Sequence, residues 1–175
     1  MSEISKFLFE GLPVRGTLLR LTGGWAEILR RRAASPTGAY AQPVQQLLGE
    51  MVAAGVLMQS QLKFDGSLAV QIMGEGPLKL AVAEVKSDLG FRATASVRGD
   101  VSDAAALTDL VSRAHQGKCA ITLTPAKLQP GQTAYQGVVP LVDAQGQPLQ
   151  SLSAMLSHYM LQSEQLDTRL VLAAN

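Results

Sequence analysis

The sequence predicts an α+β fold, with a largely antiparallel or mixed sheet and helices packed on one of its faces. Three successive segments alternate apolar and polar residues and are joined by short connections, which is typical of an antiparallel meander. Several other segments repeat apolar residues at helical spacing. Hydrophobic residues make up 47% of the 175 residues and charged residues 17%. This composition can supply a core and fits a single domain spanning residues 1–175.

The amino-terminal region predicts extended chain followed by one short helix. Glycine and proline interrupt the first apolar stretch, so residues 15–21 form the better strand. In the segment WAEILRRR, Trp25, Ile28 and Leu29 share one helical face. The run Arg30–Arg32 falls in the last turn of this helix, where cations suit the negative end of the helix dipole.

The strongest helix signal begins at Gln42-Pro43 and runs to about Gln61. Proline is tolerated in a first turn because its missing N–H would have no intrahelical partner there. Apolar residues follow i, i+3, i+4, i+7 spacing, and the small residues 53–55 widen the apolar face. We therefore expect a largely buried helix.

The meander is predicted to follow this helix directly. Asp65-Gly66 marks a turn. Apolar residues then alternate with other residues along segments 68–72, 78–82 and 91–97. These three strands are expected to pair in sequence order.

The remaining part of the sequence predicts a capped helix, a hairpin and a last helix. Ser102 or Asp103 can cap a helix that Gly117 ends. CAITLTP and AYQGVVPL are two strands able to pair with each other, and a helix follows Ser151. The final segment TRLVLAAN predicts the start of a further strand.

The loop Gly74-Glu75-Gly76-Pro77 is the segment that most suggests a phosphate cradle. A dinucleotide fingerprint requires a strand, three glycines in G-x-G-x-x-G, and then a helix whose amino terminus holds the phosphate. Here the third glycine is missing, and Pro77 leads into the alternating pattern of a strand. We interpret the loop as a β-turn in which glycine supplies a positive φ.

The two histidines and the single cysteine form no convincing site. His115 falls at a predicted helix end and Cys119 at a strand start, where a small buried hydrophobe is the simpler interpretation. One thiol makes neither an intrachain disulfide nor a multi-cysteine zinc site. His158 follows Ser157, but adjacent helix positions point in different directions and no G-x-S-x-G elbow is present.

The remaining polar residues also predict no chemistry. The 14 carboxylates are scattered, and no spacing pairs two of them for acid–base catalysis. Arg30–Arg32 fits a solvated helix end. We therefore expect no catalytic, cofactor-binding or metal residues and no enzyme activity. Five methionines lie in apolar stripes, where a place in the core is favoured over an adaptable binding surface: Met51, Met58, Met73, Met155 and Met160.

Charge and composition argue against several kinds of partner. A net charge of +1 gives no electrostatic footprint for nucleic acid, and 5% aromatic residues disfavour base stacking. Glu3 and Glu10 interrupt the amino terminus, which therefore does not predict a secretory signal. Residues 51–62 are too short and too polar to span a membrane. We expect a cytoplasmic protein with no nucleic-acid, nucleotide or membrane partner.

Several longer blocks resemble the heat-shock protein 33 family, the bacterial redox-regulated holdase chaperones. QPVQQLLGEMVAAGVLMQSQLKFDGSLAVQIMGEGPLKLAVAEV resembles the most characteristic stretch of the family. FEGLPVRG fits its opening, and AITLTP, YQGVVPL and SEQLDTRL fit later blocks in the same order. The resemblance runs from Phe7 to Leu172. One departure is Asp167, where the family pattern has proline.

The resemblance implies an ATP-independent chaperone of the heat-shock and stress response. Such a protein binds unfolded or partly folded client proteins under oxidative stress and prevents their aggregation, and its active form is a dimer. The resemblance assigns no client-contact residues in this sequence. Binding varied clients requires exposed, adaptable apolar surface. The strand faces and the helix spanning residues 152–160 are candidates for that surface.

The redox switch of the family is a carboxy-terminal zinc site built from Cys-x-Cys and Cys-x-x-Cys motifs. Cys119 matches none of these four cysteines, so residues 1–175 resemble only the amino-terminal core domain. Zinc is expected in the full-length protein, through cysteines outside this sequence, and no cofactor is expected in this chain. In the family, the linker before the switch packs on the core when reduced and leaves it on oxidation.

Two other functions stay open. A constitutive protein–protein interaction domain predicts one shape-complementary patch for one folded partner. An enzyme with an unrecognised site predicts a deep pocket lined by converging polar groups with perturbed pKa values.

Overall fold

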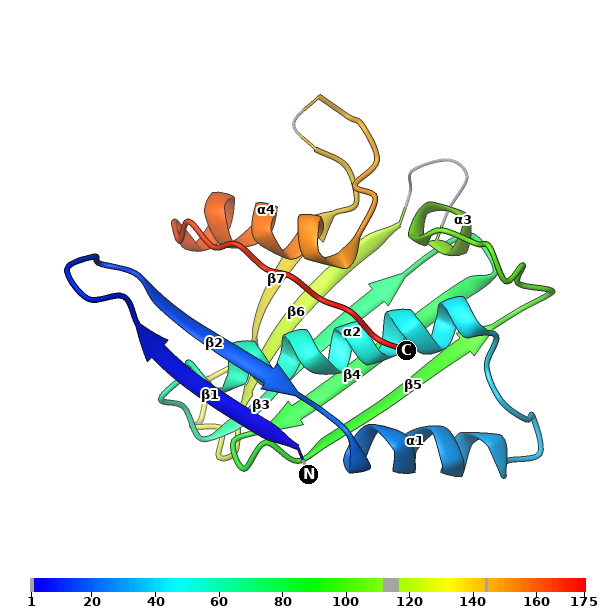
Figure 1. Cartoon of the computed structure of the whole chain (residues 1–175), viewed down its shortest axis with the longest axis horizontal. Coiled ribbons are helices and arrows are strands. Elements are labelled where there is room, and N and C mark those ends of the chain that lie inside the picture. The colour runs from blue at the N-terminus through cyan, green and yellow to red at the C-terminus, as the bar shows by residue number, and fades with distance from the viewer. Residues whose placement is uncertain (1, 112–116, 144) are drawn as a thin grey trace. The chain divides into compact units, whose positions relative to one another are not determined.

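The structure is a computed structural model that describes residues 2–111, 117–143 and 145–175. The chain divides into two compact units, Met1–Tyr40 and Ala41–Asn175, and the strands of both units pair in antiparallel sheets (Figure 1). The predicted α+β class is confirmed. No helix among the described residues is long and apolar enough to cross a membrane.

The first unit consists of a hairpin and a helix. Strands β1 (Glu3–Leu8) and β2 (Arg15–Arg20) pair with each other, and helix α1 (Gly23–Ala33) follows. Phe7 lies opposite Gly16, and a Cβ at position 16 would come within 2.2 Å of the Phe7 ring. Glycine is therefore required there because the ring covers its Cα.

The second unit is built on one five-stranded antiparallel sheet. Its strands stand in the order β5-β4-β3-β6-β7, so the predicted meander and the predicted hairpin are both confirmed. The hairpin strand β6 joins the meander by pairing with β3 along its whole length. The strands are β3 (Gly66–Met73), β4 (Leu78–Lys86), β5 (Phe91–Val97), β6 (Lys118–Pro125) and β7 (Tyr135–Pro140).

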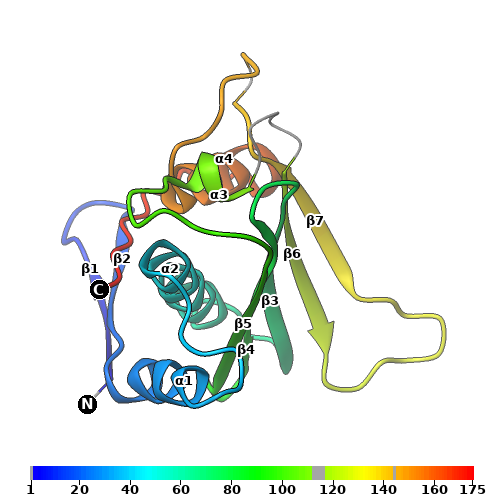
Figure 2. The same ribbon diagram turned by 90° about the vertical axis from the view of Figure 1, so that its right-hand side faces the viewer.

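Two helices of this unit cover one face of the sheet, as the edge-on view in Figure 2 shows. Helix α2 (Gln42–Gln59) packs against β3, β4 and β5, and α4 (Leu152–Glu164) packs against β7. Gly55 of α2 lies so close to the sheet that a Cβ there would be 2.9 Å from Val85 Cγ2. The core lies between these helices and the inward-facing residues of the strands.

The loop Gly74–Pro77 connects β3 to β4, as predicted, but the predicted reason for its glycines is wrong. Neither Gly74 nor Gly76 has a positive φ. Both are crowded instead by helix α3 (Leu107–Val111). A Cβ at 74 would lie 2.3 Å from the Val111 carbonyl oxygen, and one at 76 would lie 2.5 Å from that of Leu110. Gly76 also donates its N–H to Val111 O at 2.8 Å.

Two other expectations differ from the structure. Helix α3 begins only at Leu107, and Ser102 Oγ accepts from the Ala104 N–H in the turn that precedes it. The later part of that predicted helix, including His115, lies outside the described residues. The final segment 168–175 is not a strand. Its residues alternate between half-buried and exposed, but none of them pairs with another strand in the described chain.

Candidate functional site

The face of the five-stranded sheet opposite α2 and α4 is here called the open face. The strand registers place its side chains in rows that cross all five strands. The central row, from β5 to β7, is Thr94, Val82, Gln71, Ala120 and Val138. The rows on either side of it are Ser96, Leu80, Met73, Lys118 and Pro140, and Arg92, Glu84, Ala69, Thr122 and Gln136.

The open face carries accessible apolar side chains on three of its strands. Val138 is 55% exposed, Met73 41% and Leu80 36%, although they lie on three different strands. Antiparallel sheets that face water on one side usually alternate apolar inward residues with polar outward residues. Here apolar side chains stand on both faces of the sheet. Exposed apolar surface with a polar margin is typical of a binding surface.

Polar and charged side chains stand beside these apolar residues. Arg92 and Glu84 form a cross-strand ion pair. Burial alone would raise the pKa of Glu84, but hydrogen bonds from Arg92 and Ser67 bring that pKa below its usual value. Gln136 Nε2 donates to Thr122 Oγ1 at 3.1 Å. Lys118 projects from the row that holds Met73 and Leu80, so a cation stands beside exposed methionine and leucine.

The sequence produces this face because β4 is apolar at consecutive positions. Ala81, Ala83 and Val85 point into the core, whereas Leu80 and Val82 point the other way. Sequence reasoning missed Leu80 and Val138 as surface residues. A run of consecutive apolar residues in an antiparallel strand would have predicted them, because only one face of such a strand needs to be buried.

The methionines divide between the two faces. Met51 and Met155 are fully buried, which confirms the expected core role for these two. The same expectation is wrong for Met73, because the register of β3 turns its side chain to the open face. An unbranched, polarisable side chain in that position suits contact with varied apolar partners.

The hairpin of the first unit carries a second set of exposed apolar residues. Phe7 and Phe9 contact each other edge to face, with ring centroids 5.6 Å apart. A hairpin of only two strands cannot bury both of its faces within itself. The exposed large apolar residues of this region are Ile4, Phe7, Leu8, Phe9, Leu12, Val14 and Leu18.

The arginine run of α1 is engaged within its own unit. Glu27 accepts hydrogen bonds from Arg30 at 2.7 Å and Arg31 at 2.6 Å, and these bonds lower the pKa of Glu27 to about 2. The guanidinium of Arg32 lies 3.9 Å from the centre of the Tyr40 ring. For Arg30 and Arg31, which are both exposed, the expected solvated helix end is confirmed.

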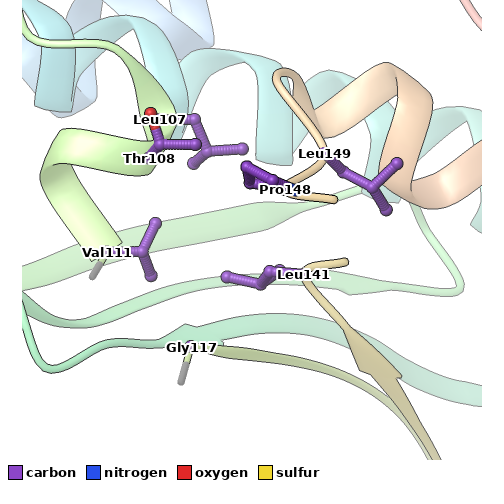
Figure 3. Close-up of a pocket in the computed structure, with 7 residues that line it drawn as sticks. All are labelled: Leu107, Thr108, Val111, Gly117, Leu141, Pro148 and Leu149. Atoms are coloured by element: carbon purple, nitrogen blue, oxygen red, sulfur yellow. The ribbon is translucent and has the colours of Figure 1, made fainter. Parts of the chain in front are cut away.

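One small pocket lies between α3 and the segment before α4 (Figure 3). Leu107, Thr108 and Val111 of α3 face Leu141, Pro148 and Leu149 across it, and Gly117 closes one side. The only polar side chain in this lining is the Thr108 hydroxyl. The lining supplies no acid or base that could activate this hydroxyl, and no charged group that could bind an anion.

The predicted candidate residues lie on separate elements of the fold. Cys119 is buried in β6, and burial raises the pKa of its thiol to about 12, so it behaves as a small hydrophobe as expected. His158 lies on α4, far along the chain from Cys119, and His115 is outside the described residues. No group of three or more metal-ligating residues occurs among residues 2–111, 117–143 and 145–175.

Helix α4 does not offer the free apolar surface that the sequence suggested. Leu152, Met155, Leu156 and Tyr159 are all buried. The periodicity correctly indicates an apolar stripe, but that stripe is buried where α4 packs against β7 and α2. Of the two candidates for an exposed client surface, only a strand face remains open in this structure.

Comparison with known proteins places these features in a family. The model of the family described as Hsp33 protein matches residues 2–175. A 33 kDa chaperonin of Chromobacterium violaceum is 49% identical over 172 residues, which are 98% of this chain and 53% of that protein. A 33 kDa chaperonin of Methylobacillus flagellatus is 39% identical over 174 residues, 99% of this chain and 53% of that protein. The chain thus spans about half the length of the curated relatives it matches.

A solved structure shares the fold. The crystal structure of a 33 kDa chaperonin of Thermotoga maritima, also named heat shock protein 33 homolog, aligns with a TM-score of 0.66 at 20% identity. The alignment covers 93% of this chain and 51% of that one. Together with the family match over residues 2–175, this likeness confirms the predicted resemblance. The chain belongs to the heat-shock protein 33 family.

Proposed function

We propose that this chain is the core of an ATP-independent holdase chaperone that binds unfolding proteins and prevents their aggregation. The open face is the observation that carries the proposal. Its exposed Met73, Leu80 and Val138 lie in adjacent rows of one sheet, where they can contact several apolar side chains of a client together. Family membership and the names of the curated relatives support the same function.

The shape and chemistry of the open face suit a client that has lost its own structure. An unfolded chain exposes apolar side chains in no fixed arrangement, so a flat apolar surface with a polar margin can accept many of them. The neighbouring Thr94, Gln71 and Thr122 can meet the polar groups of the client. No nucleotide is required, because such binding needs only exposed surface.

Redox control, zinc and dimerisation are proposed for the full-length protein. By family resemblance, four cysteines beyond this sequence bind zinc when reduced and release it on oxidation. Residues of this chain do not fit that site, because Cys119 is its single cysteine and is buried. A homodimer through a sheet edge is proposed on the ground that edge strands present unpaired backbone groups. A cytoplasmic location is proposed as well.

An enzyme is less well supported than a chaperone. That alternative predicts a deep pocket with converging polar groups, whereas the pocket beside α3 is small and almost entirely apolar. The second alternative is an interaction domain with one folded partner. A pull-down that compares native and denatured bait protein distinguishes the two, because such a domain binds native bait in a saturable manner whereas a holdase prefers denatured bait.

The test is suppression of light scattering from a thermally unfolding client, with the oxidised full-length protein and with this chain. Triple replacement of Met73, Leu80 and Val138 by serine should abolish suppression, because it removes the large exposed apolar side chains of the open face. Serine replacements at three apolar residues elsewhere that are at least as exposed form the matched control: Leu128, Leu161 and Val171. If the open-face variant suppresses scattering as well as the control does, clients bind elsewhere.

A further inference from the structure

Two phenols and a carboxylate meet where the end of α4 reaches the edge strand β7. The Tyr159 hydroxyl donates to Glu164 Oε1 at 2.6 Å, and the Tyr135 hydroxyl donates to the same oxygen at 3.2 Å. The two hydroxyl oxygens are 3.4 Å apart. Tyr159 and Glu164 belong to α4, whereas Tyr135 begins β7. One carboxylate oxygen thus joins the last turn of the helix to the sheet.

The strand is shaped to receive this cluster. A Cβ at Gly137 would lie 2.6 Å from the Tyr159 hydroxyl oxygen, so the phenol occupies the space that a side chain on β7 would fill. Hydrogen bonds from a phenol to a carboxylate are charge-assisted and stronger than those between neutral groups. The cluster therefore has both the fit and the chemistry of a specific attachment.

Helix α4 runs antiparallel to β7. Its end lies at Tyr135, and its beginning follows the short loop after Leu141, where the Leu149 N–H donates to Leu141 O at 2.9 Å. This direction places its first turns over the part of the sheet that contains Val139. Cys119 of β6 pairs with Val139 and faces the same side. The single thiol of the chain therefore lies on the helix-covered face of the sheet, one strand in from the edge strand that α4 packs against.

The remaining attachment of α4 is a single apolar stripe. Four of its 13 residues are buried, the helix packs against β7 and α2, and β7 is hydrogen-bonded on one side only. The chain leaves the helix at Gln165, which has a left-handed conformation with φ of 56°. Elements with few buried contacts at the edge of a fold open at a lower free energy than the whole protein unfolds.

We propose that Tyr135, Tyr159 and Glu164 form a latch that holds α4 over the β6–β7 edge, and that release of α4 exposes a second apolar surface. That surface comprises the underside of the helix, with Leu152, Met155 and Leu156, and the strand positions it covers. The latch is a positioning device at the point where the chain leaves the sheet. The use of the second surface by clients rests on the proposed function, but the latch itself does not.

Accessibility of Cys119 measures the release directly in this 175-residue chain. Cys119 is fully buried on the helix-covered face, so a thiol reagent reaches it only when that cover opens. If release of α4 is this opening, the labelling rate reports the population of the released state. Tyr159→Phe keeps the ring and removes the donor. We expect labelling about tenfold faster, which is the effect of losing one hydrogen bond of about 1.4 kcal/mol. Tyr135→Phe should accelerate labelling less, because its bond to Glu164 is longer.

Two matched variants exclude general destabilisation. Tyr40→Phe removes a phenol in the other unit, and Asp167→Asn removes the charge of an exposed carboxylate three residues after Glu164. Neither should change the labelling rate. Glu164→Gln retains an acceptor oxygen but loses the charge, so its effect should fall between those of Asp167→Asn and Tyr159→Phe.

Global unfolding by urea is measured for each variant in parallel. If the latch exists, the rate of Cys119 labelling in wild type should depend little on urea concentration, because a local opening exposes little surface. Tyr159→Phe should then increase the labelling rate by a larger factor than it increases the population of globally unfolded protein. The proposal is overturned if labelling follows global unfolding in every variant, or if Tyr40→Phe accelerates it as much as Tyr159→Phe does.

The second apolar surface has its own readout. Tyr159→Phe should bind more of a dye that fluoresces on apolar surfaces and should suppress client scattering at a lower protein concentration. Faster labelling without improved suppression would retain the latch and remove its role in client binding. Absence of chaperone activity in the wild-type protein would instead remove the proposed function and leave the labelling test unchanged.

Discussion

Helices α2 and α4 lie on the same face of one sheet but are held there in different ways (Figure 2). Eleven of the 18 residues of α2 are buried, and the helix packs on three strands that include the centre of the sheet. Four of the 13 residues of α4 are buried, and the helix packs on an edge strand with a polar cluster at its end. The apolar contact of α2 is broad, whereas α4 combines a narrower apolar stripe with a few specific hydrogen bonds at its end.

This difference teaches that helical periodicity does not measure how firmly a helix is held. Both helices show the same i, i+3, i+4 pattern of apolar residues. The free energy that retains each one depends on the area that it buries, because hydrophobic stabilisation is roughly proportional to buried apolar area. The chain thus combines a fixed helix and a releasable helix in one layer.

The largest expected effect lies in α2. Leu48→Ala should lower the free energy of unfolding by about 2–5 kcal/mol, because it leaves a cavity at a side chain that is 1% exposed. Urea unfolding followed by circular dichroism measures this change. Leu156→Ala in α4, where the side chain is also 1% exposed, should in addition increase Cys119 labelling more than it increases global unfolding. Equal behaviour of the two variants in both assays would remove the distinction between the helices.

The next effect concerns the turn between β3 and β4. Gly76→Ala should destabilise the protein by about 1–3 kcal/mol, because the new methyl group overlaps the carbonyl of Leu110 and forces α3 away. Gly23→Ala is the control, because a Cβ there meets nothing within 4 Å and φ is not positive. A thermal shift for Gly76→Ala no larger than that for Gly23→Ala would contradict the close approach of α3.

A smaller effect appears only at alkaline pH. Burial raises the pKa of Cys119 from 9.0 to about 12, so between these values the unfolded chain loses a thiol proton that the folded chain retains. Stability therefore falls as pH rises through this window. Wild type should lose more unfolding free energy than Cys119→Ala between about pH 8 and about pH 10. Parallel losses in the two proteins would indicate that the thiol is already accessible, as it would be if α4 were detached.

The smallest effect on stability is expected on the open face. Val138→Ser should change the free energy of unfolding by less than about 0.5 kcal/mol, because the side chain is 55% exposed and packs little. Client suppression should nevertheless decrease measurably. A large loss of stability would show that this face is covered in solution.

Much of the fold could be predicted from local pattern. The alternation in β3, β4 and β5 has the period of a strand, and α4 follows Ser151 as expected. The connection at Gly74–Pro77 was also predictable, because apolar alternation resumes after Pro77. The reason for its glycines was not, since it depends on α3, which lies more than thirty residues further along the chain.

The type of candidate site could be predicted from the sequence, but the residues that form it could not. The family resemblance implied an exposed apolar surface, and the sequence offered both strand faces and the 152–160 helix for it. The pairing of β3 with β6 decides that Met73 faces outward beside Lys118. The packing of α4 on β7 decides that Leu156 is covered.

The sequence by itself determined the α+β class, the order of most elements and the family, because these depend on periodicity and on long collinear blocks. The tertiary structure decided which apolar face remains open and which residues meet at the end of α4. The physical reason is that exposure and hydrogen bonding depend on distance in space. Tyr135 and Glu164 lie 29 residues apart along the chain, and yet they share one hydrogen bond.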